Sequence, residues 1–302
     1  GIPEAKKVMV KVKPLDDEVI LMLNSMASMC DPRLAHAYNE FKNTIGFKGC
    51  HKRELAVMSQ TDPRFVNNAP TTYMAWQDDS REAYVLVQEL MENMELMDSA
   101  DDTSGWTQEH FQVAIRGISE VHSIWYGKEE ELAQKEWIID APNTENMVAK
   151  TRLWEMLGAH AQEEFPEWIS EQDLNRYRDR LYGMKDWYQE IDAMPKTLIH
   201  NDFNPRNIAF KRSGQGGKGP LSLCAYDWEL ATVHLPQHDL AELLVFTLQP
   251  NFKQSDVETF IELHRIELEG LVGAAIDAKQ WRRGFTLCLW DLVVNRVQMY
   301  VM

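Results

Sequence analysis

The 302-residue chain has few cysteines and no long apolar run. Its four cysteines are scattered without CxxC spacing, so they predict free thiols in a reducing compartment rather than disulfides or a zinc site. No apolar run approaches the ~20 residues that span a bilayer, and the N-terminal residues lack the pattern of a signal peptide. We therefore expect a cytoplasmic protein that has no membrane partner.

Positive charge is also scarce. Lys and Arg number 31 against 47 Asp and Glu, which gives a formal net charge of −16. A nucleic-acid surface needs clustered positive charge, so no nucleic-acid partner is expected. The acidic balance favours a cationic or neutral small molecule. Four acids in the C-terminal third lead us to expect a negatively charged acceptor pocket there, suited to a cationic acceptor: Glu242, Glu262, Glu267 and Asp291.

A P-loop is absent as well. Residues 213–220, SGQGGKGP, are rich in glycine. A Walker A loop, however, needs GxxxxGK[ST] between a strand and a helix, whereas Pro220 and a second predicted strand follow this segment. We therefore predict a hairpin turn that joins strands at 207–212 and 221–227.

The most informative stretch that is present runs from 198 to 229. In it, Asp202 precedes Asn207 by five positions, and Asp227 follows the next apolar run. Kinase-type phosphoryl transfer needs this set, because one Asp accepts the proton of the attacking hydroxyl while an Asn and a second Asp hold the metal ions on the nucleotide phosphates. We assign Asp202 and Asn207 as catalytic residues, and Asn207 and Asp227 as ligands of Mg²⁺, which prefers hard oxygen donors.

The segment resembles the catalytic loop of the aminoglycoside phosphotransferase and choline kinase superfamily, the small-molecule branch of the protein-kinase-like fold. His200, Asp202 and Asn207 match that loop. Asp227-Trp228-Glu229 is similar to the superfamily's Asp-x-Glu/Asp motif, and Asp239 in PQHDLAELL matches a structural Asp just downstream. The resemblance implies that His200 and Asp239 orient the loop and that Glu229 is a further candidate contact to the metal.

The resemblance spans roughly residues 8 to 245 and implies the architecture. We expect an α+β, bilobal protein-kinase-like fold, with a small mixed β N-lobe at 1–91 and a mainly helical C-lobe at 92–302 that carries the catalytic loop and the substrate site. ATP would lie in the cleft between the lobes. Such enzymes carry a Gly-rich, nucleotide-covering loop before the lysine strand, and only ten residues precede Lys11. Either this upstream segment is missing from the chain, which we expect, or the protein holds the phosphates in a different way.

Two further parts of the N-lobe are expected to bind the nucleotide. Lys11, in the strand VKVKP, is favoured as the lysine that faces the α- and β-phosphates, and Lys13 is the alternative because it points to the same face. The expected ion-pair partner is Glu54 in HKRELAVM. In the hinge strand VLVQELM, backbone groups of Glu89 and Met91 would bind adenine.

Apolar periodicity and turn signals predict the remaining elements. Strands are expected at 7–13, 72–76 and 84–88, and a helical region at 16–60 with breaks near 31–32 and 46–49. Further helices are expected at 106–125, 144–163, 170–191, 237–248, 254–272 and 277–300.

The function that this sequence favours is ATP-dependent phosphorylation of a hydroxyl on a small molecule. One alternative is a kinase that acts on Ser or Thr of a peptide during natural-product maturation, which an open acidic groove along the C-terminal helices would favour. The other is a pseudokinase that acts as a binding module, which the missing upstream loop favours. The complete set of Asp202, Asn207 and Asp227 weighs against a pseudokinase.

Overall fold

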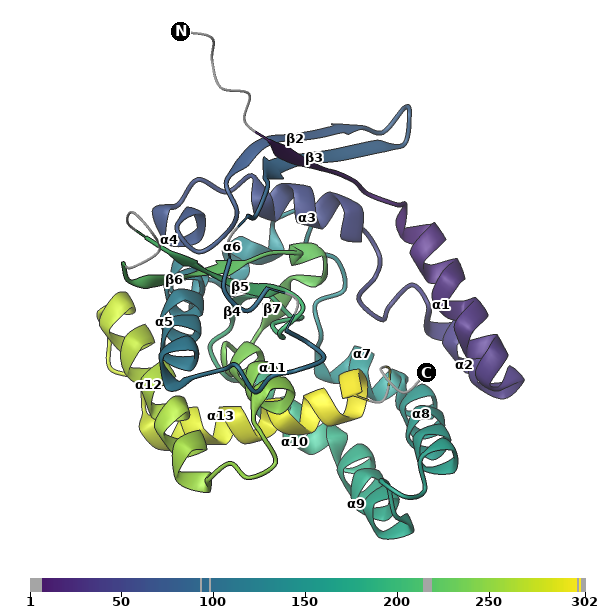
Figure 1. The fold of residues 1–302 in the computed structure, drawn as a ribbon. Helices are drawn as coiled ribbons and strands as arrows, with labels where there is room; N and C mark the ends of the chain where they lie inside the picture. The colour runs from purple at the N-terminus through teal and green to yellow at the C-terminus, as the bar shows by residue number, and fades with distance from the viewer. Residues whose placement is uncertain (1–6, 93, 98, 214–218, 298, 300–302) are drawn as a thin grey trace, which may run out of the picture.

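In the computed structural model, a small sheet with its helices lies above a larger helical part (Figure 1). The structure describes residues 7–92, 94–97, 99–213, 219–297 and 299. Within these ranges, no helix is both long and apolar enough to cross a bilayer. The chain leaves the sheet after Glu89, close to the lobe boundary predicted at 91 and 92. The division into two domains itself stays a prediction.

The upper part contains an antiparallel sheet of three strands in the order β1-β3-β2. Its strands are β1 (Val8–Val12), β2 (Thr72–Asp78) and β3 (Ala83–Glu89). The side chains of β1 alternate, so that its three valines are exposed while Lys11 is half-buried, and Lys13 directly after the strand is buried. This inverts the usual burial preference, and the ion pairs of those lysines, described below, account for it.

Four helices lie between β1 and β2 in the chain: α1 (Asp16–Cys30), α2 (Pro32–Phe41), α3 (Cys50–Met58) and α4 (Pro63–Val66). Of these, α3 packs on β2 and β3, whereas α2 and α4 pack on helices of the lower part. The two predicted breaks are present. Asp31 accepts a hydrogen bond from the backbone of Arg33 and caps α2, which begins with a proline. Asp62 caps α4 in the same way, and a proline again follows the capping residue.

The lower part is mainly helical. Its elements up to the catalytic segment are α5 (Gln108–Trp125), α6 (Glu129–Ala133), α7 (Thr144–Ala149), α8 (Thr151–Glu164), α9 (Glu171–Tyr182) and α10 (Met184–Asp192). Each of the two long helices predicted at 144–163 and 170–191 is divided in two. Lys150 and Gly183 stand at the divisions with ψ of 8° and 2°, outside helical geometry.

Two short strand pairs hold the predicted motif. Strand β4 (Thr197–Ile199) pairs with β7 (Thr232–His234), and β5 (Ile208–Arg212) pairs with β6 (Leu221–Ala225). A 3₁₀ turn, η1 (Trp228–Leu230), follows Asp227. The predicted hairpin therefore has both its strands, while residues 214–218 of its turn lie outside the described residues. Sequence periodicity missed β4 and β7 because each has only three residues.

The last helices close the lower part. They are α11 (Gln237–Thr247), α12 (Gln254–Val272) and α13 (Ala278–Asp291). The helix predicted at 277–300 changes after Asp291 into a π-helical segment, Leu292–Val297, and residues 298 and 300 lie outside the described residues. π-Helical turns are frequent at functional sites, and this one brings Arg296 to the catalytic loop.

Candidate active site

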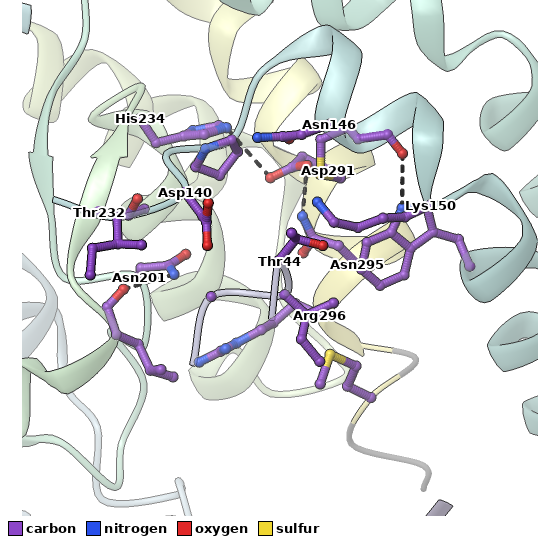
Figure 2. A pocket seen from close by; sticks show the side chains of 18 of the residues that line it. Thr44, Asp140, Asn146, Lys150, Asn201, Thr232, His234, Asp291, Asn295 and Arg296 are labelled. Carbon is purple, nitrogen blue, oxygen red and sulfur yellow. Dashed lines mark hydrogen bonds and ion pairs between the residues drawn. The ribbon is translucent and has the colours of Figure 1, made fainter. Parts of the chain in front are cut away.

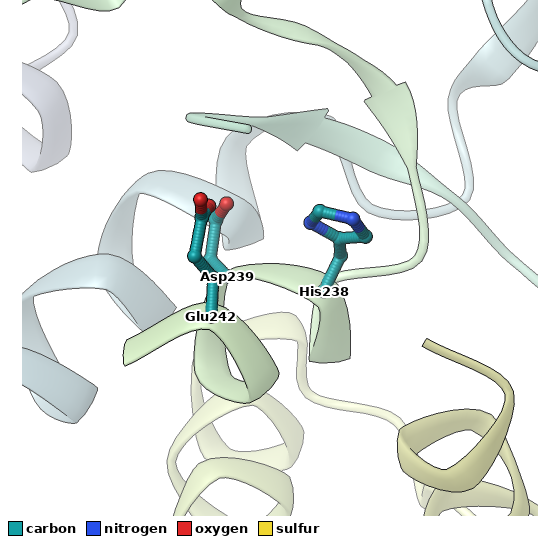
Figure 3. A group of neighbouring side chains, drawn as sticks. All are labelled: His238, Asp239 and Glu242. Atoms are coloured by element: carbon teal, nitrogen blue, oxygen red, sulfur yellow. The ribbon is translucent and has the colours of Figure 1, made fainter. Parts of the chain in front are cut away.

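A buried carboxylate fixes the start of the catalytic loop. Asp239, at the beginning of α11, accepts hydrogen bonds from the backbone N–H groups of His200 (2.8 Å) and Asn201 (2.9 Å). A third bond, of 2.9 Å, comes from His122 Nε2. Burial raises the pKa of Asp239, but the hydrogen bond and charge of His122 outweigh it, so the pKa is lowered. Asp239 is therefore ionised and fixes the backbone of the loop through these hydrogen bonds. Figure 3 shows its carboxylate beside that of Glu242.

The loop holds the carboxylate of Asp202 in one orientation. Asn207 Nδ2 donates to Asp202 Oδ2 (2.7 Å) and to the Asp202 carbonyl (2.9 Å). Asn204 Nδ2 donates to Oδ1 over 2.8 Å, and Arg296 Nη2 lies 2.6 Å from the same atom. Because both amide hydrogens of Asn207 are used on Asp202, its side-chain oxygen is the atom that remains for a cation.

Asp227 lies across the cleft from this loop. Its backbone is left-handed, with φ of 65°, directly after β6 ends. His200 Nε2 bonds the preceding carbonyl, that of Tyr226, over 2.9 Å and so links the two motif segments. A cleft of about 350 Å³ is lined by Asp202, Asn207 and Asp227 together, so the structure brings the three predicted residues to one place.

Lys11 in β1 and Lys13 directly after it have different surroundings. Lys11 Nζ lies 2.9 Å from Glu54 Oε1 and 2.6 Å from Asp227 Oδ1, and its side chain is 28% exposed. Lys13 is 1% exposed and bridges Glu54, at 2.5 Å, and Glu229. Burial lowers the pKa of Lys13, but these two carboxylates more than offset it, so the pKa is raised. Lys11 thus lies at the cleft, whereas Lys13 is enclosed behind it.

The carboxylates around these lysines form a group suited to a cation. Oxygens of Glu54, Asp227 and Glu229 all lie within 4.8 Å of one another. In this structure the ammonium groups of Lys11 and Lys13 offset only part of their negative charge. Asp227 is the most exposed of the three acids. The donor set therefore fits Mg²⁺, which takes carboxylate and amide oxygens and keeps several waters.

The predicted hinge is present only in part. The backbone N–H of Glu89 already donates to the carbonyl of Thr71 (2.9 Å), and its side chain pairs with Lys211. That N–H is therefore not open to adenine. Among the described residues, Met91 has no backbone hydrogen bond, and its sulfur lies 3.8 Å from that of Cys224.

The four acids expected to line a negatively charged acceptor pocket do not gather around one cavity, and the charge of the acceptor pocket stays a prediction. Glu262 pairs with Arg265 on α12, and Glu267 of α12 pairs with Arg116 of α5. Glu242 is buried beneath the loop. Only Asp291 of the four predicted acids lines the polar cavity beside the cleft. The other charged residues that line this cavity (Figure 2) are Arg53, Asp140, Lys150 and Arg296.

Sequence reasoning missed Arg296 and Lys150. Arg296 is 94 residues from Asp202 in the sequence, and no motif in the sequence around it indicates a contact with the catalytic loop. Lys150 lies at a helix junction that apolar periodicity did not resolve. A lysine at such a junction is usually exposed, so no sequence signal indicated its burial.

Comparison with solved structures shows the fold. A provisionally assigned aminoglycoside phosphotransferase from Ralstonia eutropha JMP134 is 16% identical with a TM-score of 0.50, over 81% of this chain and 71% of that chain. Type VIII aminoglycoside-3'-phosphotransferase is 14% identical with a TM-score of 0.47, over 95% and 84%. The choline kinase LicA from Streptococcus pneumoniae is 17% identical with a TM-score of 0.44, over 80% and 69%. The first likeness confirms the kinase-like fold class expected from the sequence.

Comparison with sequence families identifies the family to which the chain belongs. A search of curated proteins found no match to the chain. A model of the ecdysteroid kinase-like family matches residues 7–272, which is well over half of the chain. This match confirms the small-molecule kinase expected from the catalytic motif. The chain belongs to the ecdysteroid kinase-like family.

Proposed function

We propose that this kinase transfers the γ-phosphoryl group of ATP to a hydroxyl of its acceptor, with Asp202 receiving the hydroxyl proton. The observation that supports it is the convergence of Asp202, Asn207 and Asp227 on one cleft, opposite Lys11. Hydrogen bonds from Asn207 and Arg296 fix the orientation of the Asp202 carboxylate. Phosphoryl transfer depends on such positioning, because the protein has little covalent work to do.

Asn207 and Asp227 would hold Mg²⁺, which when bound neutralises charge on the β- and γ-phosphates. Lys11 now lies against Asp227. We infer that nucleotide binding moves the Lys11 ammonium onto a phosphate while Glu54 keeps the side chain extended. Met91 and the carbonyl of Glu89 would contact the adenine, a smaller hinge contact than the sequence suggested.

For the acceptor, we propose a neutral, hydroxyl-rich and partly apolar molecule, as the family description suggests. The cavity beside Asp202 carries balanced charges, with three cationic and two anionic side chains, and apolar residues such as Ile139, Met147 and Trp154. A balanced, mixed lining suits a neutral ligand better than a cation.

A panel assay tests this function. The chain is incubated with Mg-ATP and ecdysteroids, sterol alcohols, sugars, aminoglycosides, choline or Ser/Thr peptides, and ADP and phosphoester are measured by mass spectrometry. We expect stoichiometric ADP and phosphoester with a neutral polyol. Transfer to peptides alone would favour the peptide kinase. Binding of ATP without transfer to any acceptor would favour the binding module.

The metal assignment has its own test. We expect Asp227→Asn to remove the Mg²⁺-dependent part of ATP affinity, because a neutral amide is a poor substitute for a metal-binding carboxylate. Asn207→Ala should weaken it less. Calorimetric titration with ATP, with and without Mg²⁺, measures both. Unchanged Mg-ATP affinity in Asp227→Asn would exclude Asp227 as the ligand.

A further inference from the structure

A small cavity adjoins the catalytic cleft and contains a buried lysine. The cavity measures about 70 Å³, and its walls come from the loop after α2, from α7 and α8, from β7 and from the end of α13. It shares Leu230, Arg296 and Met299 with the cleft that holds Asp202. One molecule could therefore place a hydroxyl at Asp202 and extend past Arg296 into the cavity. Its volume suits only one end of such a molecule.

Lys150 is the notable group in this cavity. The residue is 3% exposed, and its side chain points across the space toward Asp291 and Asn295 (Figure 2). Among the residues that the structure describes, its ammonium has no hydrogen bond or ion pair. Burial lowers the pKa of Lys150 to about 8, although Asp140 and Asp291 act to raise it. The ammonium therefore faces the cavity as a hydrogen-bond donor that a ligand there could use.

The other cations of the cavity are already engaged. Arg53 donates to the carbonyls of Gly46, Lys48 and Glu229 at 2.8 to 2.9 Å. Arg296 is paired with Asp202. Within the described cavity lining, Lys150 is therefore the cationic donor left for a ligand.

The charges around Lys150 indicate what kind of atom it would bind. Asp140 and Asp291 lie near enough to affect its pKa, so an anionic ligand group would meet their repulsion. His234 also lines the cavity, and burial lowers its pKa to about 4, so it is neutral at pH 7 and adds no positive charge. A neutral oxygen acceptor fits these surroundings better than a carboxylate.

We propose that the ammonium of Lys150 donates a hydrogen bond to a carbonyl oxygen at the end of the acceptor remote from the phosphorylated hydroxyl. The inference rests on the proposed function, since it takes the acceptor's hydroxyl to lie at Asp202. Lys150 is then a specificity residue and takes no part in the chemistry.

Cyclopentanone, a ketone small enough for the cavity, is the probe for the test. Its binding to the full chain is measured by saturation-transfer NMR at about pH 7, beside cyclopentanecarboxylate. We expect millimolar binding of the ketone by the wild type and roughly tenfold weaker binding by Lys150→Met, since a hydrogen bond to a charged group contributes about that much. Lys196→Met is the matched control, because Lys196 is also largely buried but lines neither cavity nor cleft. It should bind the ketone like the wild type.

Three results would overturn the proposal: no ketone binding by the wild type, equal binding by Lys150→Met, or tighter binding of the carboxylate. Thermal melts control for folding, and Lys150→Met should melt no lower than the wild type because it removes an unpartnered buried charge. If that variant does not fold, Lys150→Gln replaces it and should also lose most of the affinity. Failure of the proposed function is distinct, since ketone binding at Lys150 would then persist without phosphoryl transfer to any acceptor in the panel.

Discussion

Lys11 of β1 and Lys13, directly after this strand, share Glu54 but differ in exposure. Lys11 reaches the cleft, so we expect Lys11→Met to weaken ATP binding at least about tenfold and to change stability little. Lys13 is enclosed by two carboxylates, so Lys13→Met should leave Glu54 and Glu229 unbalanced and cost about 3 kcal/mol of unfolding free energy. Urea denaturation and calorimetric titration of ATP measure the two effects. The reverse pattern would make Lys13 the phosphate lysine.

The same residues show what local sequence can predict. Asp202 and Asn207 lie in one loop, so their spacing alone indicated their chemistry. Glu54 was predicted as a partner from its place on a helix, and it pairs with both lysines. Lys150 and Arg296 were not predictable, because their roles arise from tertiary contacts that no short spacing encodes.

At the level of elements, α11 and the π-helical segment act together on the catalytic loop. Asp239 of α11 binds the backbone of residues 200 and 201, and Glu242 accepts a hydrogen bond of 2.9 Å from the N–H of Phe203. The π-helical segment brings Arg296 within 2.6 Å of Asp202 and 3.6 Å of Glu242. Burial raises the pKa of Glu242, and the Arg296 charge opposes this rise.

We therefore expect Arg296→Met to destabilise the fold by about 3 kcal/mol, because two carboxylates lose their cation. It should also lower kcat, because Asp202 loses one of the groups that hold it. Adding Glu242→Gln should restore much of the stability but not kcat. Urea denaturation and steady-state kinetics test this pair. Arg282→Met is the control, since Arg282 forms an exposed pair with Glu258 and should cost less than about 1 kcal/mol. Full recovery of kcat in the double variant would contradict a positioning role.

Elements with strong periodicity or capping signals were predictable. Helix α5 was expected from 106 to 125 and runs from 108 to 125, and the strands of the small sheet lie within a few residues of their expected ranges. The divisions at Lys150 and Gly183 and the π-helical end of α13 were missed. These features depend on packing between helices, which sequence periodicity does not report.

Across the whole molecule, buried histidines set the response to acid. Burial lowers the pKa of His234, to about 4, and of His264, well below its usual value. The unfolded chain binds these protons near pH 6.5 and the folded chain only at lower pH, so stability is lost as pH falls from about 6.5 to 4. His238 acts in the opposite direction: burial lowers its pKa, but the hydrogen bond and charge of Asp291 more than offset this, so its pKa is raised.

Urea denaturation at about pH 7.5 and pH 5 measures this loss. We expect His234→Gln to lose about 2 kcal/mol less than the wild type between these values, because one proton contributes about 1.4 kcal/mol per pH unit below 6.5. His36→Gln is the control and should behave like the wild type. Equal losses for His234→Gln and the wild type would show that His234 does not stay neutral in the fold.

The overall architecture followed from the catalytic motif and its resemblance, which indicated a kinase-like fold before any packing was known. The net charge of −16 did not predict the lining of the cavity beside Asp202, which carries charges of both signs. Most acids are paired or lie on outer helices, such as Glu262 and Glu267. Global charge describes the surface, whereas a pocket takes its charge from the few residues that face it.

The most direct test of the phosphotransferase is the turnover of Asp202→Asn, measured with Mg-ATP and the best acceptor from the panel. The variant keeps the shape of the side chain but cannot take the hydroxyl proton. We expect kcat to fall to less than about a tenth of the wild-type value, with ATP affinity almost unchanged, because the base acts on the acceptor and not on the nucleotide. If Asp202→Asn turns over at a rate near that of the wild type, Asp202 is not the base and the mechanism proposed for this cleft is wrong.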